Sequence, residues 1–106
     1  MKAAILDILS HSERPIKRIQ LLWLLHSRYI EIDDRAMRKA IEEMIEEGEC
    51  IASSKNGYHL IRNEEQVIAA VTYLKTKAKS IAIRGNCIIR NWRKKHPEST
   101  LQLELF

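Results

Sequence analysis

Apolar residues recur at alternating intervals of four and three along the second half of the chain. The repeat comprises Val67, Val71, Leu74, Ala78, Ile81, Gly85, Ile88 and Trp92. This is the heptad period of a coiled-coil seam, so it predicts one helix from Glu64 to about Lys95. We expect its first part to cover a domain and its later part to project and pair with another helix, in the simplest version as a homodimer through residues 67–92. A helix folded back on its own domain, with a break at the glycine, is the alternative.

Residues 1–32 are predicted to form two helices and a short strand. The first helix covers Lys2 to Leu9, where apolar residues share one stripe. Pro15 suits the first turn of the second helix, because its missing N–H costs nothing there. The density of leucine after it predicts a helix buried on most sides, with Trp23 in the core. Alternation from Tyr29 to Ile32 predicts the strand.

Capping and turn residues divide the next segment into a helix and a hairpin. Asp33 is a good N-cap for a third helix, and Gly48 is a good stop for it. Two β-prone runs then flank the Asn56-Gly57 pair, which is a strong hairpin signal. Asn63 can cap the long helix, with Gln66 at the reciprocal capping-box position.

These elements predict a mainly α fold with a small β-hairpin. The order of elements in residues 1–62 is that of a winged helix-turn-helix, in which the third helix is the recognition helix and the hairpin is the wing. The long helix occupies residues 63–95, and a flexible linker and tail occupy residues 96–106. A length of 106 residues suits a single core, and three glycines and two prolines leave little room for long loops.

Charge is distributed unevenly along the chain. Residues 1–54 contain eight Lys/Arg and ten Asp/Glu, whereas residues 55–95 contain ten Lys/Arg and two Asp/Glu. Such asymmetry suggests a polyanionic partner for the basic part. The alternative is that these charges keep a long exposed helix soluble.

Three segments of the chain resemble a known family. They are residues 33–48, Cys50-Ile51-Ala52-Ser53 and Gly57-Tyr58-His59-Leu60. They look like the winged-helix domains of phage and bacterial replication-associated proteins, in which the recognition helix ends in glycine, an apolar strand follows and the wing closes on a Gly-Tyr pair. The resemblance covers roughly residues 15–95, and it implies DNA binding by the third helix.

Basic residues of the third helix agree with that expectation. Arg35, Arg38 and Lys39 lie in its first half, opposite its apolar face, where arginine could pair with guanine edges and lysine with phosphates. The second half carries Glu42, Glu43, Glu46 and Glu47, so the helix must enter a groove by its N-terminal end or not at all. Further candidates for DNA contact are Lys17, Arg18, Lys55 and Asn56. A solvated charged face is the alternative for each of these groups.

The last five residues resemble a second known motif. Gln102-Leu103-Glu104-Leu105-Phe106 looks like the QLxLF pentapeptide with which bacterial replication and repair proteins bind the sliding clamp. The resemblance implies a polar contact for Gln102 and an apolar pocket for Leu103, Leu105 and Phe106. Glu104 stands where Ser or Asp is most usual. An edge strand or a tail folded on the domain is the alternative.

Residues for catalysis or metal binding are not apparent. The four histidines have unrelated spacings, Cys50 and Cys87 do not form a zinc-binding motif, and there is no glycine-rich phosphate loop. We therefore expect no enzyme activity, no cofactor and no metal. We also expect no signal peptide or membrane span, and reduced thiols in a cytoplasmic protein.

The function predicted from the sequence is that of a DNA-binding adaptor. It would act in phage or bacterial DNA replication or repair and recruit the sliding clamp. A winged-helix transcriptional regulator and a protein–protein interaction module without DNA binding are the alternatives.

Overall fold

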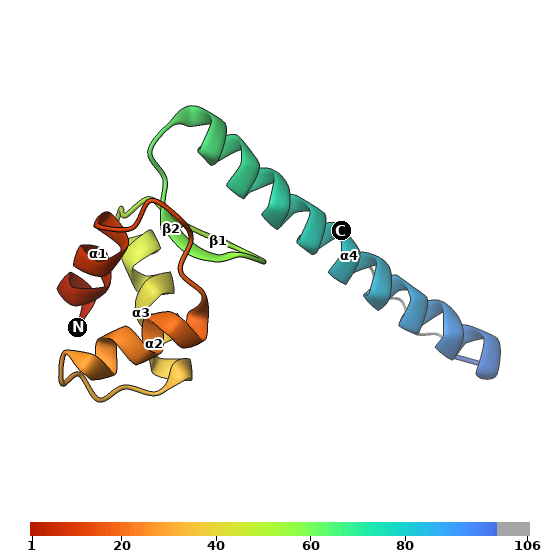
Figure 1. The fold of residues 1–106 in the computed structure, drawn as a ribbon. Helices are drawn as coiled ribbons and strands as arrows, with labels where there is room; N and C mark the ends of the chain where they lie inside the picture. Colours follow the sequence, from red (N-terminus) through yellow and green to blue (C-terminus); the bar gives the residue numbers. More distant parts are fainter. Residues whose placement is uncertain (100–106) are drawn as a thin grey trace. The chain divides into compact units, whose positions relative to one another are not determined.

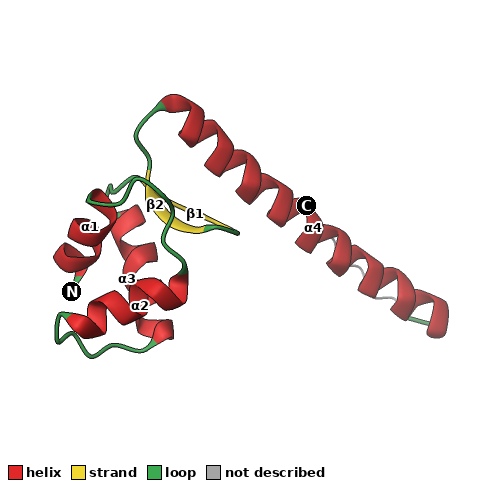
Figure 2. Cartoon of the chain, viewed as in Figure 1, coloured by secondary structure: helices red, strands yellow, loops and turns green. Residues whose placement is uncertain are grey.

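The computed structural model describes residues 1–99, and these are mainly helical with one small hairpin (Figures 1 and 2). In chain order the elements are α1 (Lys2–Ser10), α2 (Arg18–Ser27), α3 (Asp34–Glu46), β1 (Ile51–Ser54), β2 (Gly57–Leu60) and α4 (Glu64–Lys95). The predicted fold class is therefore confirmed. The described residues divide into two compact units, Met1–Ala70 and those from Val71 onward.

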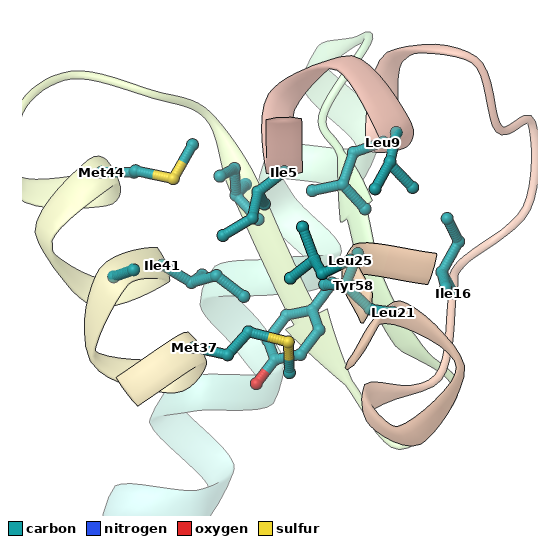
Figure 3. Close-up of a cluster of buried hydrophobic side chains, with 12 residues drawn as sticks. Ile5, Leu9, Ile16, Leu21, Leu25, Met37, Ile41, Met44 and Tyr58 are labelled. Carbon is teal, nitrogen blue, oxygen red and sulfur yellow. The ribbon is translucent and has the colours of Figure 1, made fainter. Parts of the chain in front are cut away.

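Helices α1, α2 and α3 and the hairpin surround one hydrophobic core (Figure 3). Each helix contributes apolar residues at intervals of three or four, which place them on one face. The most deeply buried side chains are Ile5 and Leu9 of α1, Leu21 and Leu25 of α2, and Met37, Ile41 and Met44 of α3. Ile51 and Tyr58 close the core from the hairpin.

The hairpin is tied to the segment before α2. Its strands are antiparallel with Ser53 opposite Tyr58, and the two residues Lys55 and Asn56 form its turn. Ile16 and Tyr58 exchange two backbone hydrogen bonds, each 2.8 Å long. Gly57 has φ +116°, and a Cβ there would collide with the Ile16 carbonyl. Glycine is therefore required where the two segments meet.

The predicted helix caps are present. The Asp33 carboxylate accepts a hydrogen bond from the Ala36 N–H at 2.7 Å, and Gly48, with φ +118°, follows the end of α3. The Asn63 Oδ1 accepts from the Gln66 N–H at 2.9 Å at the start of α4. The Gln66 side chain, however, accepts from the Arg62 N–H rather than from the expected N–H of the cap residue.

Two predictions about the segment around α2 are wrong. The helix begins at Arg18 rather than Pro15, because Ile16 pairs with Tyr58. Residues 29–32 do not form a strand. Tyr29 takes a left-handed backbone with φ 63°, and the Ile32 carbonyl bonds the His26 ring at 2.8 Å. These local bonds to the end of α2 replace pairing with another strand.

Burial of α2 also differs from the prediction. Of its residues only Leu21 and Leu25 are fully buried, so the helix packs on the core through one face. Trp23, predicted to be in the core, is 66% exposed. Trp23 is two residues from each of the buried leucines, and two residues along a helix turn a side chain to roughly the opposite face.

Helix α4 extends through Gly85 without the break considered as an alternative. None of its side chains is buried, so its first turns do not cover the core as expected. At its end the Trp92 indole stacks on the His96 ring, with ring centroids 3.6 Å apart, and its N–H donates to the Ser99 hydroxyl at 3.2 Å. The pentapeptide of residues 102–106 lies outside the described residues. Of the helices within residues 1–99, none has the length and apolar character needed to cross a membrane.

Candidate nucleic-acid interface

The first half of α3 presents basic side chains to solvent. Met37, Ala40, Ile41 and Met44 are buried, so the helical period directs Arg35 and Lys39 away from the core. Both side chains are exposed, and within residues 1–99 neither has an ion-pair partner. They are therefore available to an anionic ligand.

Asp34 links two other candidate arginines. Its Oδ1 lies 2.9 Å from the Arg18 Nε, and its Oδ2 lies 3.2 Å from the Arg38 Nε. The carboxylate thus joins the first turn of α2 to the first turns of α3. These ion pairs are partly exposed and add little to stability. Their main consequence is positional, because both guanidinium groups converge on one carboxylate.

A shallow hollow brings the start of α2 and the hairpin together. Its lining residues are Lys17, Arg18, Ile19, Ser53, Ser54, Lys55, Gly57 and Tyr58. Three basic residues predicted separately from the sequence, Lys17, Arg18 and Lys55, therefore border one surface. The cause is the backbone pairing of Ile16 with Tyr58, which holds the two segments side by side. Asn56 is exposed in the turn, where its N–H donates to the Ser54 hydroxyl at 3.2 Å.

Tyr58 connects this hollow to the core. Its side chain packs among the buried residues (Figure 3), and burial raises the pKa of its phenol, with the charge of Arg18 acting in the opposite direction. The sequence pattern indicated a wing tyrosine but gave no sign that it would border the site. Ser53 and Ser54 were missed as well, because their position follows only from the strand pairing.

The acidic second half of α3 is partly neutralised by α1. The Lys2 ammonium lies 2.8 Å from a Glu47 carboxylate oxygen and 3.2 Å from one of Glu43. The hydrogen bond to Glu47 raises the pKa of Lys2. Glu42 and Glu46 form no such pair within the described part of the chain, so they carry the negative charge that would oppose phosphate.

A second hollow has the opposite character. It is lined by Leu22, His26, Tyr29, Glu31, Ile32, Asp33 and Asp34. It contains three acidic residues and no lysine or arginine, so it does not suit an anionic ligand. The basic hollow is therefore the better candidate for contact with nucleic acid.

The unit from Val71 onward has a basic surface of its own. Residues 71–95 contain eight Lys/Arg and no Asp/Glu. One of these groups, the Lys77 ammonium, lies 5.0 Å above the centre of the Tyr73 ring. This part of α4 could follow a phosphate backbone through charge alone.

Comparison with protein-family models, with curated proteins and with solved structures gives no match to this chain.

Proposed function

We propose that the protein is a DNA-binding adaptor of the winged-helix class that acts in phage or bacterial DNA replication or repair. The observation that carries the DNA-binding part is the convergence of Lys17, Arg18 and Lys55 around one hollow. Arg38 is joined to this group through Asp34. A group of cations contributed by the start of α2, by α3 and by the hairpin suits the phosphates of a duplex.

In this proposal α3 enters the major groove by its N-terminal half. Arg35 and Lys39, which have no ion-pair partner within residues 1–99, would face the base edges and adjacent phosphates. Lys17 and Lys55 would contact the backbone on either side of the hollow. Glu42 and Glu46 would stay outside the groove, where they limit how deeply the helix can enter.

Recruitment of the sliding clamp is proposed from the sequence match alone. Leu103, Leu105 and Phe106 would fill the apolar pocket of the clamp, and Gln102 would make the polar contact. A short segment held by a few apolar side chains gives reversible binding, which suits an adaptor.

Titration of a labelled duplex against the full chain at several salt concentrations tests the DNA-binding proposal. We expect the double variants Lys17→Ala/Lys55→Ala and Arg35→Ala/Lys39→Ala to weaken binding. The first should also reduce the salt slope by about 1 for each phosphate that the variant no longer neutralises. Arg28→Ala is the control for loss of a basic group outside the interface, because Arg28 pairs with Asp7 at the far end of α2. Equal reductions in affinity for all three variants would contradict the proposed interface, and absence of binding would favour a protein–protein module.

Clamp binding is tested separately with purified bacterial sliding clamp. The full chain should bind, whereas a chain truncated after Thr100 and the Leu105→Ala/Phe106→Ala variant should not. Glu104→Ala is the control, since this position has no defining role in the motif. If the truncated chain binds equally well, the motif does not act. Tail-independent recognition of a palindromic DNA site would then favour a transcriptional regulator.

A further inference from the structure

The apolar seam of α4 is exposed at seven of its eight residues, and Gly85 is half-buried. Leu74, Ile81 and Ile88 are 58%, 61% and 63% exposed, and no side chain of the helix is buried. The seam consists of eight residues, which are Val67, Val71, Leu74, Ala78, Ile81, Gly85, Ile88 and Trp92. A continuous apolar row on a solvated helix indicates a surface that another molecule covers.

We propose that this seam pairs with the same seam of a second copy of the chain in an antiparallel coiled coil. In the proposed register, Ala78 of each copy lies opposite Ile81 of the other copy. The two-fold axis passes between these two equivalent pairs. The inference concerns α4 alone, so it does not depend on the proposed function, and it can be tested without DNA or clamp.

Side-chain size favours this register. Moving outward from the axis, Leu74 would lie opposite Gly85, Val71 opposite Ile88, and Val67 opposite Trp92. Each small seam residue is thus matched with a larger one, as knobs-into-holes packing requires. A parallel pair in register would place Ala78 on Ala78, Gly85 on Gly85 and Trp92 on Trp92. That arrangement would leave gaps at two layers and crowd a third.

Charge at the ends of the helix favours the same register. The seam positions that continue the repeat beyond Val67 and Trp92, three residues away in each direction, are Glu64 and Lys95. Antiparallel pairing places Glu64 of each copy opposite Lys95 of the other, so the row ends in opposite charges at both ends. A parallel pair would place Glu64 on Glu64 and Lys95 on Lys95, and like charges would repel. Antiparallel helices also place opposite ends of their dipoles together.

One contact opposes this arrangement. Lys77 and Arg84 of opposite copies lie on the same flank of the seam near the axis. The Lys77 ammonium lies over the Tyr73 ring of its own helix. Tyr73 is further from the seam than Lys77 is. The cation is therefore directed outward, and its repulsion of the arginine is screened by solvent.

Sedimentation across a range of protein concentrations tests whether a second copy covers the seam. We expect the full chain to dimerise and the Leu74→Lys/Ile81→Lys variant to be monomeric. In this variant the unit of residues 1–70 should still be folded. A full chain that remains monomeric at every concentration would overturn the proposal, and the occupant would then be a different molecule.

Cross-linking tests the direction of pairing. In a background in which Cys50 and Cys87, both free, are replaced by serine, Val71→Cys and Ile88→Cys chains are mixed and oxidised. Antiparallel pairing predicts mainly the mixed disulfide, and disulfides within each variant would show a parallel pair instead.

Charge reversal tests the register. Glu64→Lys and Lys95→Glu should each weaken dimerisation, and the double variant should restore it. Glu65→Lys makes the same change of charge outside the seam and should have a smaller effect. If Glu64→Lys dimerises as tightly as the unmodified chain, the proposed register is wrong.

Discussion

Asp33 and Asp34 are adjacent at the start of α3 but have different partners. The Asp33 carboxylate caps the helix through the Ala36 N–H, whereas the Asp34 carboxylate lies between two arginines of the candidate interface. Asp33→Ala should therefore lower the free energy of unfolding by about 1 kcal/mol. Asp34→Ala removes a negative charge beside the proposed phosphate contacts, so DNA affinity should rise by about 1 kcal/mol, roughly fivefold.

Urea unfolding and duplex titration of both variants separate these effects. Asp33→Ala acts as the control for loss of an acidic group near the start of α3. If both variants raise DNA affinity equally, general charge rather than the link between Arg18 and Arg38 accounts for the change. If Asp34→Ala weakens binding, the carboxylate is needed to position the arginines.

Leu25 and Trp23 show how position on a helix outweighs residue size. Leu25 is fully buried, and Trp23, two residues earlier, is 66% exposed. Leu25→Ala should therefore lower the free energy of unfolding by about 2–5 kcal/mol. Trp23→Ala should change it by no more than about 0.5 kcal/mol. Urea unfolding followed by circular dichroism gives both values, and a large loss for Trp23→Ala would show that its ring covers apolar surface.

Elements that depend on short-range signals could be predicted from the sequence. Asp33, Gly48 and Asn63 mark helix ends through bonds to their immediate neighbours, and α3 and α4 begin where these residues predict. The start of α2 could not be predicted in this way. It depends on Ile16 pairing with Tyr58, a residue far along the chain, and local periodicity contains no information about such a partner.

The same distant pairing explains what was missed at the site. Each basic residue around the hollow was identified from local patterns, but their meeting depends on the hairpin lying against the start of α2. The exposure of Trp23 was missed for a related reason. A leucine-rich helix has several possible apolar faces, and only the packed structure shows that the core takes the one with Leu21 and Leu25.

Gly57 is the backbone position on which this junction most depends. Its positive φ disfavours any side chain, and a Cβ would also collide with the Ile16 backbone. Gly48 has a similar φ, of +118°, but nothing lies within 4 Å of the place where its Cβ would be. Gly48→Ala should therefore cost about 1–2 kcal/mol from backbone strain alone. Gly57→Ala should cost more than that, and it should also weaken DNA binding by displacing Lys17 from Lys55.

Thermal unfolding and duplex titration of the two glycine variants provide the comparison. Binding is measured well below the unfolding transition, so that only folded protein is titrated. Equal destabilisation of the two variants would mean that the Ile16 segment moves aside without cost, and it would contradict the proposed role of this junction.

At the scale of the whole molecule, the core belongs to the unit of residues 1–70, whereas most of the seam belongs to the unit from Val71 onward. Within residues 1–99, the buried residues all lie between Ile5 and Tyr58, and α4 contributes none of them. A fragment of residues 1–70 should therefore fold by itself, with a melting temperature that does not change with its concentration. The full chain should show a concentration-dependent loss of helix on heating, because the proposed dimer holds α4 together by mass action. In proteins most of the stability of a helix comes from packing of its apolar face rather than from intrinsic helix propensity. Circular dichroism of the fragment and of the full chain at several concentrations measures both behaviours.

A fragment that fails to fold would show that α4 stabilises the core. A full chain whose melting is independent of concentration would show that α4 is stable without a second copy.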